Sequence, residues 1–231
     1  MKLLIAILGA TDYLEALAMQ ERLLHLRQQN KVSDIMLLLQ HPPTLTLGTR
    51  ENRYNILTPE AELQKLGVKI YKINRGGDVT YHGPGQIVGY PILNLNGYGK
   101  SVRLYVDKLE EVFLELLRDE YGITAGRDNQ YTGVWVGDEK ITAIGCSVKR
   151  WVTMHGFAFN VNTDLNHFKW INPCGITDKG VTSLQKILGQ PQDIDRVNGQ
   201  VISHFSRVFN CEPEFIDRQS LQDILGGQAH E

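Results

Sequence analysis

The clearest hydrophobic pattern in the chain runs from Val102 to Tyr121. Apolar residues recur there every three or four positions, which places them on one face of an α-helix that packs against a core. Ser101 precedes this segment and is a favourable N-cap residue, while Gly122 follows it and suits a left-handed C-cap. A second segment of the same period covers about 193–209, and a shorter one lies near 218–225. The pattern therefore predicts three amphipathic helices.

Apolar runs bounded by Pro, Gly or a capping residue predict further elements in the first half of the chain. Asp12 followed by Glu15 forms a capping-box pattern that starts a helix directly after the apolar run MKLLIAILGA. Two prolines interrupt the run IMLLLQHPPTLTLG, so it predicts two strands rather than one. The predicted elements are a strand over 1–10, a helix over about 12–31, two strands within 35–48, a short helix with Pro59 at its first position and Gly67 as its stop, and a strand over 68–74.

Residues 131–161 predict three antiparallel strands. The segments YTGVWVG and KITAIGCSV form a hairpin around Asp138-Glu139, and WVTMHGFAFNV follows as the third strand. The segment 163–182 shows no periodic pattern. Hairpins combined with separate helical runs predict an α+β fold, a mixed or antiparallel sheet flanked by helices. We expect one domain over 1–231, with a core over about 1–190 and C-terminal helices over about 191–231.

Composition places the chain among ordinary globular proteins, and its net charge of −2 offers no basic footprint for nucleic acid or an anionic membrane. No apolar run approaches the roughly 20 residues that span a bilayer. Cys146, Cys174 and Cys211 form no C-x-x-C pair, and their odd number favours a reducing compartment over a disulfide scaffold. We therefore expect a cytoplasmic protein. No Cys or His pair has metal-ligand spacing, so a metal site is not predicted.

The segment Arg75–Gln86, RGGDVTYHGPGQ, contains five Gly or Pro residues among several hydrogen-bonding side chains. Glycines let the backbone approach a ligand closely, and Pro84 stiffens the turn between two of them. The glycine spacing matches neither a P-loop nor a dinucleotide-binding fingerprint. A wide β-turn without a ligand is one alternative. The clustered polar side chains favour the wall of a small-molecule site.

Cys174, in the sequence NPCGIT, lies between Pro and Gly and outside any apolar periodic segment. A nucleophilic cysteine reacts as its thiolate and needs a cation or a base nearby. The sequence leaves four candidates open for that role: Lys140, His82, His155 and Lys179. Cys146 and Cys211 lie in or beside apolar segments, which is typical of small buried residues.

Four motifs in order, RGGDVTYHGPGQIVGYPI, EKITAIG, HGFAFN and NPCGIT, make the chain resemble the lipoyl(octanoyl) transferase family of the lipoate-protein ligase B type. The similarity also includes LLLQHPPTLTLG and VTSL, so it covers most of the chain from Leu8 to Leu184. It implies the fold of biotin and lipoate protein ligases. The implied activity moves an octanoyl group from acyl carrier protein to a lysine on lipoyl domains of oxoacid dehydrogenase E2 subunits and on the glycine-cleavage H protein.

The resemblance also implies roles for particular residues. Cys174 would carry the acyl group as a thioester, and Lys140 would be its dyad partner. The residues implied to frame the acyl site are Arg75, Gly76, Gly77, Asp78, Val79, Thr80, Tyr81, His82, Ala143, Ile144, Gly145, Gly156, Phe157 and Ala158. Transfer between thioesters needs no ATP, so neither a cofactor nor a metal is implied. Four cations are candidates for steering an acidic carrier protein: Lys149, Arg150, Lys169 and Lys179.

Three alternatives remain at this point. An ATP-dependent lipoate or biotin ligase would use the glycine-rich loop to hold an acyl-adenylate, and its turnover would need ATP and Mg²⁺. A cysteine hydrolase would combine Cys174 with His82 or His155 and release free octanoate, with no need for a lipoyl-domain acceptor. A non-catalytic acyl-binding module would retain its function in a Cys174→Ala variant.

Overall fold

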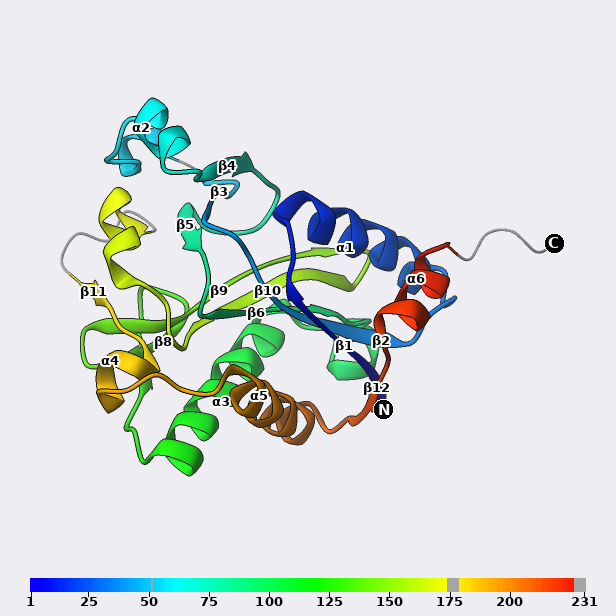
Figure 1. Ribbon diagram of the computed structural model, residues 1–231. Helices are drawn as coiled ribbons and strands as arrows, with labels where there is room; N and C mark the ends of the chain where they lie inside the picture. The colour runs from blue at the N-terminus through cyan, green and yellow to red at the C-terminus, as the bar shows by residue number, and fades with distance from the viewer. Residues whose placement is uncertain (51, 174–178, 227–231) are drawn as a thin grey trace.

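A computed structural model describes residues 1–50, 52–173 and 179–226, and its central feature is a large mixed sheet (Figure 1). In this part of the chain, nine strands form the sheet in the order β12-β1-β2-β6-β10-β9-β8-β7, with β11 paired to β9. A smaller sheet has the order β4-β3-β5. The strands are β1 (Lys2–Ala10), β2 (Asp34–Gln40), β3 (Thr44–Leu47), β4 (Lys69–Lys72), β5 (Val79–His82), β6 (Gln86–Ile92), β7 (Gly126–Arg127), β8 (Val134–Val136), β9 (Glu139–Lys149), β10 (Val152–Asn160), β11 (Gly180–Val181) and β12 (Glu212–Phe215).

The strands of the large sheet run in both directions. Strand β1 is parallel to β2 and β12, and β11 is parallel to β9. The central strands β2, β6, β10, β9 and β8 form a continuous antiparallel ladder. This arrangement confirms the predicted α+β class and mixed sheet. The hairpin predicted around Asp138-Glu139 is formed by β8 and β9.

The helices begin and end at residues that satisfy their terminal backbone groups. Ser101 Oγ accepts a hydrogen bond from Leu104 N at 3.2 Å, and Gly122 ends that helix with a φ of +63°. Asp12 Oδ1 accepts from Leu14 N at 2.9 Å, as expected of an N-cap. The helical elements are α1 (Tyr13–Gln28), η1 (Arg53–Asn55), α2 (Glu60–Lys65), η2 (Leu95–Tyr98), α3 (Val102–Tyr121), η3 (Leu165–Trp170), α4 (Leu184–Leu188), α5 (Ile194–Phe209) and α6 (Arg218–Gly226).

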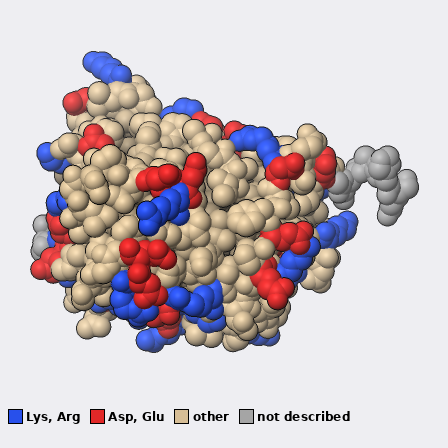
Figure 2. All heavy atoms as spheres, turned by 60° about the horizontal axis from the view of Figure 1, so that its bottom comes forward, with Lys and Arg blue, Asp and Glu red and all other residues tan. Residues whose placement is uncertain are grey.

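Two hydrophobic clusters lie on opposite faces of the large sheet. The apolar sides of α3 and α5 pack on one face, and α1 and α6 pack on the other (Figure 1). The outer surface over α3 and α5 carries intermixed acidic and basic side chains (Figure 2). Arg207 on α5, for example, pairs with Glu115 and Asp119 on α3, both at 2.8 Å. This face therefore offers no patch of a single sign of charge.

The small sheet has its own core and lies beside the large one (Figure 1). Strand β3 pairs parallel with β4 and antiparallel with β5, so it links the residues after the two prolines to the glycine-rich segment. Strand β5 leads through a turn into β6 of the large sheet. The glycine-rich segment is thus fixed between the two sheets.

The structure differs from the predicted elements in a few places. Pro59 stands one position before α2 as its N-cap, rather than at the first helical position, with a ψ of +137°. The segment 163–182, which carries no periodic pattern, contains η3 and β11 among its described residues. None of the helices in the described ranges is long and apolar enough to cross a bilayer.

Candidate functional site

Strands β9 and β10 carry small residues at matching positions. Ala143 pairs with Ala158, and Gly145 pairs with Gly156, across the antiparallel ladder. Side chains two residues apart on a strand share a face of the sheet, and both alanines pack on the face covered by α1. These pairs form a strip of the sheet without bulky side chains, which we call the small-residue strip.

The glycine-rich loop covers this strip and is held by Arg75. The Arg75 side chain is buried, with the residue only 6% exposed. Its Nη2 donates to Thr46 O at 2.7 Å and to Asp78 O at 2.8 Å, and its Nη1 donates to Gly76 O at 2.9 Å. A planar guanidinium can satisfy several carbonyl groups at once. Arg75 therefore fixes the loop conformation through main-chain acceptors.

Close packing explains why two positions of the strip are glycine. A Cβ on Gly145 would lie 3.1 Å from Gly76 O, because the loop rests directly on β9. A Cβ on Gly156 would collide with the backbone of Gly89 and the ring of Pro91 on β6. These glycines are thus required by the approach of the loop and of β6, before any ligand is considered.

Hydrogen bonds fix the ring orientation of two buried histidines near the strip. His41 Nδ1 donates to Thr11 O at 2.8 Å, so its Nε2 accepts from the Tyr90 hydroxyl at 2.7 Å. His82 Nδ1 contacts Gln86 Oε1 at 2.9 Å. Both rings have partners within the protein, and the His41 ring lies against that of His82, with 5.7 Å between their centroids.

A third histidine, His155, interrupts the regular geometry of β10. It has a φ of +59°, which is uncommon for a residue other than glycine and costs of the order of 1 kcal/mol. Its N–H donates to Gln20 Oε1 at 2.9 Å, and its Nε2 lies 3.0 Å from Asn74 Oδ1. The strained residue is therefore held from α1 and from the start of the glycine-rich loop.

All three imidazoles are neutral near pH 7. Burial lowers the pKa of His41 to about 4. Burial, and then the positive charge of Arg75, lowers the pKa of His155 to about 4. Burial, and then the nearby His41, lowers the pKa of His82 well below its usual value. The wall that they form is uncharged, and none of the three is a strong base.

The small-residue strip, Arg75, His82 and His155 border a cavity of about 50 Å³, which we call the narrow cavity. Most of the predicted acyl-site residues line it: Arg75, Gly76, Gly77, Thr80, His82, Ala143, Ile144, Gly145, Gly156, Phe157 and Ala158. Four further residues, Lys140, His155, Tyr13 and Tyr90, complete the lining. Segments that are far apart in the sequence thus meet around one apolar slot.

Three of the predicted acyl-site residues lie outside the narrow cavity. Val79 and Tyr81 alternate with its lining residues on β5 and belong to the core of the small sheet. The carboxylate of Asp78 accepts from Asn52 N at 2.8 Å and from the side-chain amide of Asn55. Asp78 therefore ties η1 to the glycine-rich loop.

Two other predicted residues border the cavity, but their side chains pack mainly on the opposite face of the sheet. Ile144 and Phe157 pair with each other between the two small-residue pairs, and both pack in the cluster on the α3 face. The Phe157 ring centroid lies 4.8 Å from that of Phe113 on α3. Their side chains support the strip from the opposite face of the sheet.

Lys140 lies where the narrow cavity meets two wider grooves. The residue is 8% exposed, and its Nζ lies 4.7 Å from the centroid of the Trp135 ring. Its carbonyl accepts from Thr182 N at 3.0 Å, which joins β11 to β9. Among the described residues, Lys140 alone lines all three cavities.

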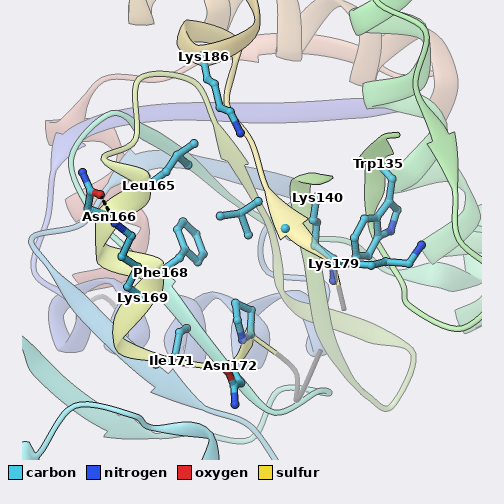
Figure 3. A pocket seen from close by; sticks show the side chains of 13 residues that line it. Trp135, Lys140, Leu165, Asn166, Phe168, Lys169, Ile171, Asn172, Lys179 and Lys186 are labelled. Atoms are coloured by element: carbon cyan, nitrogen blue, oxygen red, sulfur yellow. Dashed lines mark hydrogen bonds between the residues drawn. The ribbon is translucent and has the colours of Figure 1, made fainter. Parts of the chain in front are cut away.

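The larger groove has a volume of about 510 Å³, and four lysines line it. Figure 3 shows Trp135, Lys140 and Lys179 on one wall and Phe168 and Lys169 of η3 on the other. We call it the lysine-lined groove, defined by Trp135, Lys140, Phe168, Lys169, Lys179 and Lys186. A second groove of about 440 Å³, the polar groove, is lined by residues that include Arg50, Asp78, Gln130 and Cys146.

Cys174, the predicted nucleophile, lies outside the described residues. Pro173 and Lys179, the nearest described residues on either side, both line the lysine-lined groove together with Lys140. Cys146 and Cys211 are free thiols. Burial raises the pKa of Cys146 to about 11, so this thiol is a poor nucleophile near pH 7.

The lipoyl protein ligase A/B catalytic domain family matches residues 12–206 of the chain. The chain belongs to this family. An octanoyltransferase of Desulforamulus reducens is 72% identical over 98% of the chain and 99% of its own length. One of Caldicellulosiruptor saccharolyticus is 55% identical over 97% and 96% of the two chains. These relatives confirm the family predicted from the four motifs.

Solved structures of the lipoyl ligase family share the fold at low sequence identity. A lipoate-protein ligase A bound with ATP has a TM-score of 0.75 at 16% identity and covers 99% of this chain and 96% of its own. A bipartite lipoate protein ligase of Thermoplasma acidophilum, described with its E2 lipoyl domain, has a TM-score of 0.74 at 17% identity over 99% and 93%. A biotin protein ligase of Aquifex aeolicus has a TM-score of 0.53 at 16% identity and covers 91% of this chain and 71% of its own. The predicted fold relationship is confirmed.

Sequence reasoning missed several residues of the site in this member of the lipoyl ligase family. Tyr13 and Tyr90 line the narrow cavity, and Trp135 stacks beside the Lys140 ammonium. In the sequence, Tyr13 begins a helix and Tyr90 lies within an apolar strand, so neither pattern indicates a ligand. Trp135 precedes Lys140 in the predicted hairpin, and their pairing across β8 and β9 was the one available signal.

Proposed function

We propose that the protein transfers an octanoyl group from acyl carrier protein to a lysine of lipoyl domains through an acyl thioester on Cys174, as one catalytic domain. The observation that carries this proposal is the position of Lys140. It lies at the junction of the narrow cavity, whose histidines are neutral, and a groove bordered by Pro173, the residue before Cys174. The names of the two curated relatives support octanoyl transfer as the activity.

The proposed reaction has two steps that together return the enzyme to its starting state. The Cys174 thiol loses its proton, the resulting thiolate attacks the thioester carbonyl of the donor, and the bond to the carrier sulfur breaks. The carrier leaves as a thiolate and takes up the proton that Cys174 lost. The acceptor lysine amine then attacks the acyl-Cys174 carbonyl, an amide forms, and the Cys174 thiol is restored. The first step is nearly isoenergetic and the second is downhill, so the cycle consumes no ATP.

Lys140 is proposed as the partner of Cys174 in both steps. Its ammonium favours the thiolate by charge, and in the neutral form it accepts a proton from the thiol or the incoming amine. His82 and His155 are weaker candidates for this role because burial lowers the pKa of both rings. This difference supports the transferase over a Cys–His hydrolase.

The narrow cavity is proposed to hold the octanoyl tail. Its walls combine the small-residue strip, two tyrosines and neutral histidines, which suits an apolar chain better than a charged group. Lipoyl-domain acceptors are proposed from the family, and the Thermoplasma ligase of that family is described with an E2 lipoyl domain. The glycine-cleavage H protein is proposed as a further acceptor. The cytoplasm is proposed as the location, because free thiols stay reduced there.

Intact mass spectrometry after mixing with octanoyl-carrier protein, without ATP, tests the proposal. The wild-type protein should gain one octanoyl mass, and Cys174→Ala should gain none. Cys146→Ala is the matched control, because this thiol lies in the neighbouring polar groove and should not be acylated. An adduct that persists in Cys174→Ala would contradict the acyl-cysteine route, and an absolute need for ATP and Mg²⁺ would favour a ligase.

A further inference from the structure

The lysine-lined groove has an unusual charge pattern. Four lysines line it, and no Asp or Glu does so among the described residues. Its remaining surface is largely apolar or carries neutral amides: Trp135, Leu165, Phe168, Ile171, Val181 and Asn172. A ligand that fits this surface has an uncharged body and at least one anionic group.

The four lysines differ in how far their charge is already neutralised. Lys179 Nζ lies 2.7 Å from Asp128 and 3.2 Å from Asp138, and Lys186 pairs with Glu139. Lys169 Nζ donates to the neutral Asn166 Oδ1 at 2.9 Å and forms no direct ion pair among the described residues. The carboxylate that acts on its charge is Asp164, which accepts from the other side of Asn166. Lys169 therefore offers the least compensated positive charge on the groove wall that faces Lys140 (Figure 3).

The groove is continuous with the proposed reaction centre. Lys140 lines both the groove and the narrow cavity, so a ligand lying in the groove can present its end where the acyl tail begins. A protein-bound acyl donor reaches such a centre through a phosphopantetheine arm. That arm has a long uncharged body with two amides, a thioester at one end and an anionic phosphodiester at the other.

From this match we infer that the lysine-lined groove holds the phosphopantetheine arm of the acyl donor, with its phosphate at Lys169. The inference rests on the proposed function. It adds the groove in which the donor arm binds and the residue, Lys169, that contacts its phosphate. The amides of the arm face Asn166 and Asn172, and its apolar part lies along Phe168 and Trp135.

The same charge pattern argues against entry of the acceptor lysine through this groove. An incoming ammonium would meet Lys140 and Lys169, besides Lys179 and Lys186 with their paired carboxylates, and no lining residue of the described chain is acidic. Like charges at close range repel. The donor and the acceptor therefore use different routes to Lys140. Two of the cations expected to steer a carrier protein are also far from this route, because Lys149 ends β9, nine residues after Lys140, and Arg150 follows it.

Direct binding tests the inference without any turnover. Isothermal titration of the whole protein would compare 4′-phosphopantetheine with pantetheine, which lacks the phosphate. We expect the phosphorylated probe to bind about tenfold more tightly, as for one charge-assisted contact. Lys169→Ala should remove this difference and Lys169→Arg should keep it. Lys31→Ala, an exposed lysine outside the groove, is the matched control and should behave as wild type.

Acylation kinetics separate this inference from the proposed function. With octanoyl-carrier protein as donor, Lys169→Ala should raise KM about tenfold and leave kcat unchanged. If acylation occurs but both probes bind equally well, or if Lys169→Ala leaves KM unchanged, the arm lies elsewhere and the inference is wrong while the octanoyltransferase stands. If no donor acylates the protein, the proposed function fails. Tighter binding of ATP than of phosphopantetheine at Lys169 would overturn the assignment in favour of a nucleotide.

Discussion

The narrow cavity and the lysine-lined groove meet at Lys140, yet they use their polar side chains in opposite ways. Around the narrow cavity, Arg75 and His82 are buried and direct their hydrogen bonds to protein partners. Along the groove, Lys169 and Lys186 are both exposed, but Lys186 forms an ion pair with Glu139 whereas Lys169 donates to a neutral amide. A site built for an apolar chain has its polar groups satisfied in advance, whereas a site for an anionic arm leaves charge available.

This contrast predicts different consequences of substitution in the two regions. Replacement of a buried, hydrogen-bonded group beside the narrow cavity, such as Arg75 or His155, should alter stability, because these groups hold the loop and the strands in place. Changes along the groove should alter donor affinity and leave the fold intact.

Replacement of Arg75 by Met should cause the largest loss of stability. The substitution removes the Arg75 donors to Thr46 O, Gly76 O and Asp78 O, of which Asp78 O keeps a bond from Gly48 N at 3.0 Å. A buried carbonyl left without a partner costs roughly 1–3 kcal/mol, and the cavity left by the guanidinium adds to this loss. We expect the free energy of unfolding to fall by about 3–5 kcal/mol in urea titrations followed by circular dichroism. Arg103→Met, whose side chain is 92% exposed on α3, is the control and should change it by less than about 0.5 kcal/mol. Equal effects of the two substitutions would show that Arg75 does not support the loop.

Replacement of Lys140 by Ala should affect catalysis more than folding. Loss of the ammonium raises the pKa of the Cys174 thiol, so the acylation rate should fall about 100-fold at pH 6 and much less at pH 9, where thiolate forms without help. Lys100→Ala removes a comparable cation over an aromatic ring, at 5.2 Å from Trp151, and should leave the rate unchanged. A pH–rate profile of acylation measured by rapid quench provides the check. A loss that is equal at all pH values would argue against the role of Lys140 charge.

The same comparison shows how far the sequence could predict the site. The family motifs implied Arg75, Lys140 and all four residues of the small-residue strip, and the fold brings these residues to one cavity. They could not separate the two sides of β5, so Val79 and Tyr81 were assigned to the acyl site although they pack in the small sheet. The sequence shows that Val79 and Tyr81 share one face of the strand and that Thr80 and His82 share the other. It does not show that a second sheet buries the face with Val79 and Tyr81.

The groove was less visible in the sequence than the narrow cavity. Its walls come from η3, β11 and β9, and η3 lies in a segment without periodicity. Lys179 forms ion pairs with Asp128 and Asp138, which are far from it in the sequence. Only the tertiary structure therefore shows that Lys179 is paired with carboxylates and that Lys169, within the described chain, is not. Large amphipathic elements such as α3 were predicted to the residue, since their signal is contained in one segment.

The histidine wall should make stability depend on pH. His155 has a folded-state pKa of about 4, below the unfolded value of about 6.5, so the unfolded state binds more protons between these values. Its contribution to stability is complete above pH 6.5 and is lost as the pH falls toward 4. We expect His155→Asn to reduce the loss of stability between pH 6.5 and 4.5 by about 2 kcal/mol, since Asn tolerates the positive φ and does not titrate. Denaturation midpoints measured across this range give the result, and parallel curves for both proteins would contradict a buried neutral imidazole.

Ala158→Leu should have the smallest effect of the four substitutions. It changes the shape of the narrow cavity and leaves the charge of the lysine-lined groove as it is. Ala158 is 4% exposed and faces Ala143 across the strip, so a larger side chain at this position reduces a cavity of only about 50 Å³. We expect acylation by an octanoyl donor to slow about tenfold, or 1.4 kcal/mol, while a butanoyl donor is affected much less. The donors share the same phosphopantetheine arm, so their affinity at Lys169 should stay unchanged. A substitution that slowed both donors equally would place the acyl tail outside the narrow cavity and leave the groove as the only part of the site with a ligand.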